Sequence, residues 1–135
     1  MGEIIVRGDS CVFAVDDDPM FQEILQFAYS LSDLQNEFHA FSSGYDCISA
    51  LETLKVEGKP YPAVILMDIN MPGMTGIETV GKIREDANYQ DIPIITMLSS
   101  SNEDNDIERS MKAGANAYEE KPFDITQLKF VYQAE

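Results

Sequence analysis

Residues Ala63-Val-Ile-Leu-Met67 are apolar at every position, and Asp68 follows them directly. A strand that is covered on both faces has this continuous apolar pattern, whereas a strand with one solvated face alternates. Similar runs lie at 11–15 and 92–98, and weaker strand patterns lie at 37–41 and 115–119. The pattern therefore predicts a parallel sheet that is buried between two layers.

Five amphipathic helical patterns follow these predicted strands in turn, and polar or glycine residues mark their ends. The predicted N-caps are Asp18, Ser43, Ser101 and Asp124, and Gly114 is the predicted stop of the fourth helix. The fifth helix would turn Ile125, Leu128 and Val131 inward. Five strand–helix units with right-handed crossovers place helices on both faces of the sheet. The predicted fold is therefore a three-layer, doubly wound (βα)5 α/β domain.

The length of 135 residues suits one domain. We expect residues 1–10 to form an N-terminal extension, with a possible added strand at Glu3 to Val6, and residues 11–135 to form the domain itself. Cys11 and Cys47 both lie in apolar patterns, which favours two buried free thiols over the alternative of a disulfide.

The net charge of −15 restricts the classes of partner. Such a charge opposes nucleic-acid phosphates and anionic membrane surfaces, so we expect this domain to bind neither directly. The longest apolar run, 63–67, is also far too short to span a membrane. The charge permits a metal ion or a basic partner.

Polar side chains follow the predicted strands at their carboxyl ends, where ligands bind in sheets of this type. They are Asp16 to Asp18 after the first strand, Asp68 after the third, Ser99 after the fourth and Lys121 after the fifth. Carboxylates that are gathered this closely repel one another unless a cation holds them. Because the ligands would all be oxygen atoms, the sequence predicts Mg²⁺ or Mn²⁺.

Four motifs in this order resemble the receiver domain of two-component response regulators. They are Phe13-Ala-Val-Asp-Asp-Asp-Pro19, Val64-Ile-Leu-Met-Asp-Ile-Asn-Met-Pro-Gly-Met-Thr-Gly76, Met97-Leu-Ser-Ser100 and Lys121-Pro-Phe123. The resemblance covers nearly the whole chain. It implies a flavodoxin-like fold with a parallel five-stranded sheet in the order 2-1-3-4-5.

The resemblance also implies a role for each matching residue. Asp68 matches the phosphoacceptor, whose carboxylate attacks phosphorus to give an acyl phosphate. Asp16 and Asp17 match the acidic pair that binds Mg²⁺ together with Asp68, and the backbone carbonyl of Asn70 would complete the protein ligands. The metal would offset charge on the phosphoryl oxygens.

Three further matches concern the response to phosphorylation. Lys121 would pair with Asp68 and then with the phosphoryl group, through the cis Lys-Pro bond that is usual in the family. Ser99 matches the switch hydroxyl that turns toward the phosphoryl group. Tyr118 matches the aromatic switch residue that follows it, although it could also serve only in packing.

A receiver of this kind takes its phosphoryl group from a sensor histidine kinase or a histidine phosphotransfer protein. It catalyses that transfer and its own slow dephosphorylation, and is not a conventional enzyme. Phosphorylation would switch the face built from the fourth helix, the fifth strand and the fifth helix, which contacts a downstream effector protein or an output domain. The family implies a cytoplasmic protein, here either a single-domain regulator or one domain of a longer protein.

Three departures from the family pattern keep an alternative open. The spacing from Asp68 to Ser99 is one residue longer than expected, through either the loop at 89–93 or a bulge in the strand, so Leu98 or Ser100 could occupy the switch position. Glu119-Glu120 stands where an apolar residue is usual, and the Lys55 to Pro62 loop is long. The alternative is a degenerate receiver that acts as a phosphorylation-independent interaction module. An FMN protein of this topology is disfavoured, because carboxylates stand where its phosphate loop would lie.

Overall fold

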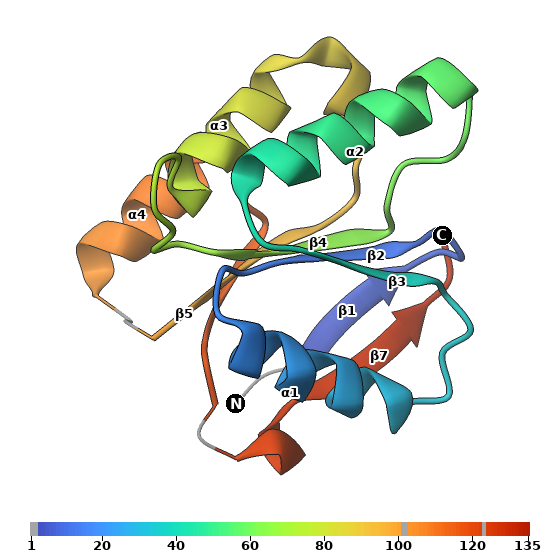
Figure 1. Ribbon diagram of the computed structural model, residues 1–135, viewed down its shortest axis with the longest axis vertical. Helices are drawn as coiled ribbons and strands as arrows, with labels where there is room; N and C mark the ends of the chain where they lie inside the picture. Colours follow the sequence, from blue (N-terminus) through green and yellow to red (C-terminus); the bar gives the residue numbers. More distant parts are fainter. Residues whose placement is uncertain (1–2, 101–102, 123) are drawn as a thin grey trace.

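A computed structural model of the chain describes residues 3–100, 103–122 and 124–135, without the side chain of residue 125. Its centre is a five-stranded parallel sheet in the order β3-β2-β4-β5-β6 (Figure 1). The strands are β2 (Val12–Val15), β3 (Phe38–Phe41), β4 (Val64–Asp68), β5 (Ile95–Ser99) and β6 (Ala117–Glu120). Because one strand precedes them in the chain, this order is the expected 2-1-3-4-5. The predicted doubly wound α/β fold is confirmed.

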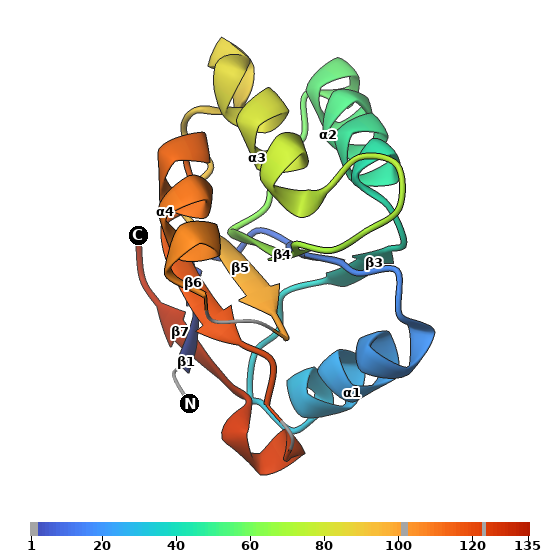
Figure 2. The ribbon, with the colours of Figure 1, turned by 90° about the vertical axis from the view of Figure 1, so that its left-hand side faces the viewer.

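Helices cover both faces of this sheet (Figure 2). The bounds are α1 (Pro19–Ser30), α2 (Gly44–Glu57), α3 (Gly76–Glu85) and α4 (Asp104–Ala113), with a short η1 (Ala87–Tyr89). Helix α1 lies on one face, and α2 and α3 lie on the other with α4 beside α3. The fold therefore has the three predicted layers.

The helix ends follow the capping chemistry of the sequence. The Asp18 side chain accepts a hydrogen bond from the Met20 N–H with Pro19 at the first position, and Ser43 accepts one from the Asp46 N–H. Gly114 ends α4 in the left-handed conformation, with φ of 116°. These three predictions are confirmed. The predicted cap Ser101 lies outside the described residues, and the N-cap position of α4 is Glu103, which makes no side-chain cap hydrogen bond.

The predicted fifth helix is wrong. Asp124 accepts a hydrogen bond from the Thr126 N–H, but the chain makes only one 3-10 turn, η2 (Ile125–Gln127), and continues as the strand β7 (Lys129–Gln133). Leu128 and Phe130, two positions apart, are both buried, which is the period of a strand. Strand β7 forms because β1 (Glu3–Arg7) pairs with it in parallel, with Ile5 opposite Val131.

Strand β1 confirms the strand that the sequence allowed near Glu3 to Val6. Ile4 and Val6 are fully buried in a hydrophobic cluster that also contains residues of α1, β2 and β7. Figure 1 shows the β1–β7 pair beside α1 on the same face of the main sheet. The two strands thus cover the area that the fifth helix was expected to cover. The boundary between residues 10 and 11 stays a prediction.

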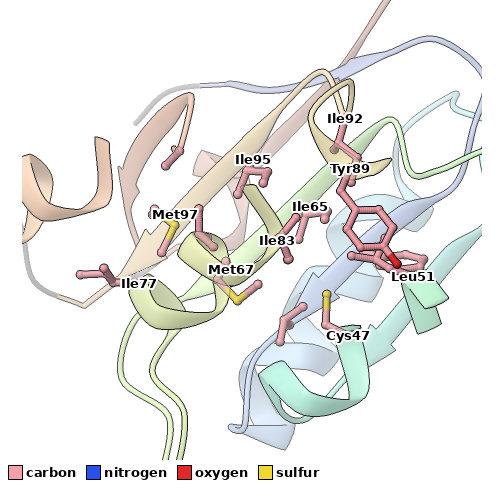
Figure 3. Packing of buried hydrophobic residues seen from close by; sticks show 14 of the residues in the cluster. Cys47, Leu51, Ile65, Met67, Ile77, Ile83, Tyr89, Ile92, Ile95 and Met97 are labelled. Carbon is pink, nitrogen blue, oxygen red and sulfur yellow. The ribbon is translucent and has the colours of Figure 1, made fainter. Parts of the chain in front are cut away.

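A second hydrophobic cluster fills the space between the main sheet and the helices α2 and α3 (Figure 3). Both cysteines are free thiols, as favoured, so the disulfide alternative is wrong. Cys47 is buried in this cluster as expected, whereas Cys11 is only half-buried. Burial raises the pKa of Cys47 to about 12 and that of Cys11 to about 11, so both thiols stay protonated. No helix in the described part of the chain is long and apolar enough to cross a membrane.

Candidate functional site

The ends of two neighbouring parallel strands, β2 and β4, bring acidic side chains to one edge of the sheet. Asp16 and Asp17 follow β2, and Asp68 is the last residue of β4. Asp16 is 2% exposed and Asp68 is 5% exposed, whereas Asp17 is open to solvent. One carboxylate oxygen from each of the three lies within 4.8 Å of the others. The predicted convergence of these carboxylates is confirmed.

Lys121 reaches this acidic group from the end of β6. Its Nζ lies 2.8 Å from Asp16 Oδ2 and 3.3 Å from Asp68 Oδ1. Its backbone N–H donates to the Ser99 carbonyl at 2.7 Å, which continues the β5–β6 pairing past the end of the strand. The described residues contain no cis peptide bond, so the expected cis Lys121-Pro122 bond is wrong. The long side chain reaches both carboxylates from a trans backbone.

The electrostatics of the group follow from this arrangement. The pKa of Asp68 is raised to about 6, first by burial and then by the negative charge of Asp16, and Lys121 offsets only part of the rise. Burial by itself would lower the pKa of Lys121, but its hydrogen bonds and ion pairs with Asp16 and Asp68 outweigh that effect and raise it. Lys121 is therefore a cation at neutral pH, and Asp68 is a carboxylate of unusually high proton affinity.

The β2–α1 loop is held by Gln22, a residue that the sequence interpretation missed. Gln22 is buried, and its Nε2 lies 3.0 Å from the Ala14 carbonyl, 3.2 Å from that of Asp16 and 3.1 Å from that of Phe41. Asp16 Oδ1 also accepts a hydrogen bond from the Asp18 N–H at 2.9 Å. A lone amide among the inward positions of α1 was the available signal. These bonds fix the backbone that carries Asp16.

The loop after Asp68 closes tightly over the end of β4. The Gly76 N–H donates to the Ile69 carbonyl at 2.8 Å, and a Cβ at position 76 would overlap the carbonyl oxygen of Asp68. Only glycine allows α3 to begin so close to the strand. Asn70 lies in this loop, two residues beyond Asp68, and is exposed. Its place beside the strand end agrees with the expectation that its backbone carbonyl could serve as a metal ligand.

Ser99 ends β5 and is completely buried. The β4–β5 pairing runs without interruption from Ile65↔Ile95 to Asp68↔Leu98, so the extra residue is not a bulge in these paired residues. Leu98 belongs to the hydrophobic cluster on the α1 side, and Ser100 is exposed. Ser99 is thus the buried hydroxyl among the three residues considered.

Tyr118 lies half-buried on the neighbouring strand β6 and shares a side-chain hydrogen bond with Ser99. Burial raises the pKa of Tyr118 most, the Ser99 hydrogen bond lowers it in part, and the carboxylates of Asp106 and Glu103 raise it further. The structure thus couples the two side chains that were expected to respond together.

The sequence model of the response regulator receiver domain matches residues 12–133. The chain belongs to this family. It is 36% identical over 129 residues to the two-component response regulator ORR1 of rice (91% of this chain, 55% of the relative). It is 32% identical to the nitrate/nitrite response regulator NarL of Escherichia coli (91% and 53%) and 30% identical to the phosphate regulon transcriptional regulatory protein PhoB of Pseudomonas aeruginosa (87% and 47%). The chain spans about half the length of these curated relatives.

Solved structures of response regulators have the same fold. The phosphorylated cyanobacterial phytochrome response regulator RcpA superposes with a TM-score of 0.77 at 25% identity, over 89% of this chain and 85% of that one. The Mn²⁺-bound form of the response regulator Rcp1 superposes with a TM-score of 0.75 at 22% identity, over 87% and 84%. At 22% identity, the likeness to Rcp1 shows that the two chains share a fold.

Proposed function

We propose that the chain is a phosphoacceptor receiver that takes a phosphoryl group on Asp68. The observation that carries the proposal is the buried Asp68 carboxylate, which lies 3.3 Å from the Lys121 ammonium and beside two further carboxylates. A carboxylate of raised pKa is a better nucleophile than an ordinary one, and it is still ionised at neutral pH. The alternative of a degenerate receiver is not favoured, because all the positions that the chemistry needs carry suitable residues.

The donor set fits Mg²⁺ or Mn²⁺. Asp16, Asp17 and Asp68 offer carboxylate oxygens within 4.8 Å of one another, which are the hard ligands that these ions prefer. We propose these three side chains, with the backbone carbonyl of Asn70, as the protein ligands. When bound, the ion neutralises negative charge on the phosphoryl oxygens during transfer.

Asp68, Lys121 and Ser99 each have a separate role in the proposed reaction. An oxygen of Asp68 forms a bond to phosphorus while the bond from phosphorus to the nitrogen of a phosphohistidine donor breaks. Lys121 holds its positive charge beside the Asp68 oxygen and can follow the negative charge onto the phosphoryl group. Ser99 can donate its hydroxyl to a phosphoryl oxygen, which changes its hydrogen bond with Tyr118. Hydrolysis of the acyl phosphate by water returns the carboxylate.

The proposed output follows from this coupling. Tyr118 belongs to β6, next to α4, so a change at Ser99 reaches the surface formed by α4 and β6. The fifth helix, the third expected part of this face, is replaced by β7. We propose a sensor histidine kinase or a histidine phosphotransfer protein as donor, an effector protein or output domain as recipient, and the cytoplasm as location.

The function is tested by incubating the purified chain with acetyl phosphate and Mg²⁺ and measuring the intact mass. We expect one phosphoryl group per wild-type chain and none on Asp68→Asn. The matched control is Asp124→Asn, which alters an exposed aspartate that caps only the 3-10 turn and should be labelled like the wild type. Equal labelling of Asp68→Asn would refute the proposal.

A further inference from the structure

The ring of Phe21 lies directly against the Lys121 ammonium. Phe21 belongs to the first turn of α1, immediately after the loop that carries the acidic pair, and it is 6% exposed. Lys121 Nζ lies over its face, 4.5 Å from the ring centroid. An ammonium at this distance from an aromatic face is attracted by the negative potential of the π system, and more strongly where water is excluded.

The contacts of Lys121 show what the ring contributes. An ammonium carries three N–H donors and accepts nothing. Two of its contacts are to the carboxylates of Asp16 and Asp68, and the third is to the Phe21 ring. An aliphatic side chain in place of the ring would leave that side of a largely buried cation against hydrocarbon, which is costly.

We propose that Phe21 is a positioning residue that holds the Lys121 ammonium at Asp68 through a cation–π contact. The proposal rests on the proposed function, in which Lys121 stabilises the charge of the transferred phosphoryl group. Asp16 and Asp68 both change their electrostatic partners when a divalent cation and a phosphoryl group bind. The ring does not, so it supports the Lys121 ammonium while its carboxylate partners change.

The test replaces Phe21 site-specifically with 4-fluoro-, 3,5-difluoro- and 3,4,5-trifluorophenylalanine. Fluorine removes negative potential from the ring face while the shape is nearly retained, so a role in packing alone would not respond. We expect the rate of phosphorylation by acetyl phosphate to fall stepwise, by about 3- to 30-fold across the series. The same series at Phe130, a buried ring that packs edge-on against Tyr29, should leave the rate within about twofold.

A second measurement does not depend on phosphorylation. In the metal-free chain, the NMR signals of the Lys121 ε-methylene should be shifted upfield by the ring current, and Phe21→Leu should abolish that shift. Absence of the ring-current shift in the wild type, or a rate that is unchanged by trifluorination, would overturn the proposal. If the wild type accepts no phosphoryl group, the proposed function fails, and the ring-current shift alone then decides whether Phe21 holds Lys121.

Discussion

Lys121 makes its shortest ionic contact with Asp16, at 2.8 Å between Nζ and Oδ2. The sequence predicted a pair between Lys121 and Asp68, which exists at the longer distance of 3.3 Å. Burial raises the pKa of Asp68 to about 6 and the charge of Asp16 adds to the rise, while Lys121, which Asp16 shares, offsets only part of it. The site is therefore charged and incompletely neutralised before any cation or phosphoryl group arrives.

The raised pKa of Asp68 makes the stability of the metal-free chain depend on pH. The folded state binds this proton more tightly than the unfolded chain, whose carboxyl has the ordinary value of 3.8. The resulting stabilisation is complete below pH 3.8 and is lost as the pH rises through about 6. Asp68→Asn should therefore be more stable than the wild type at pH 7.5, by about 1 to 3 kcal/mol. Urea unfolding at several pH values measures the difference, and equal stability at pH 7.5 would contradict the raised pKa.

The charge of Asp16 is the second cause of that raised pKa, after burial. Asp16→Asn removes the repulsion and leaves Lys121 to Asp68 alone, so the pKa of Asp68 should fall from about 6 toward its ordinary range. The ¹³C chemical shift of the Asp68 carboxyl against pH gives this value. Asp17→Asn is the matched control and should lower the pKa less, because Asp17 is the smallest of the causes. A larger effect at Asp17 would reverse this assignment.

Gln22 should be a structural support of the acidic loop. Gln22→Met keeps the size of the side chain but leaves the carbonyls of Ala14, Asp16 and Phe41 without this donor. We expect a loss of about 1 to 3 kcal/mol in the free energy of unfolding, measured by denaturant titration. Gln26→Met, one turn further along α1 and exposed, should change stability by less than about 0.5 kcal/mol. Comparable losses in the two variants would show that the three bonds are not important.

The strand β1 should be essential to the hydrophobic core although it precedes the predicted domain. Ile4 is fully buried, whereas its neighbour Ile5 points to the other face and is only partly buried. Ile4→Ala should cost about 2 to 5 kcal/mol of unfolding free energy, and Ile5→Ala markedly less. If both substitutions cost under about 1 kcal/mol, the β1–β7 pair does not stabilise the fold in solution.

The sequence predicted the main sheet because its apolar runs and helix caps are local signals. The last segment was ambiguous, since Ile125, Leu128 and Val131 fit a helix while Leu128 and Phe130 fit a strand. The segment becomes a strand because it pairs with β1, at the opposite end of the chain, and no local pattern reveals that pairing. The local patterns also mark where each strand ends, and this located Asp16, Asp68 and Lys121 at the carboxyl edge of the sheet. The contacts of Gln22 and Phe21 depend on how α1 packs against the loop and so could not be predicted.

Identifying the residue that receives the phosphoryl group tests the role of Asp68 as phosphoacceptor most directly. The chain is treated with acetyl phosphate and Mg²⁺, reduced with borohydride, which converts an aspartyl phosphate to homoserine, and digested for sequencing by mass spectrometry. We expect homoserine at position 68, dependent on Mg²⁺ and absent without the phosphodonor. Aspartate retained at position 68 under all conditions, or homoserine at Asp16 or Asp17 instead, would contradict it.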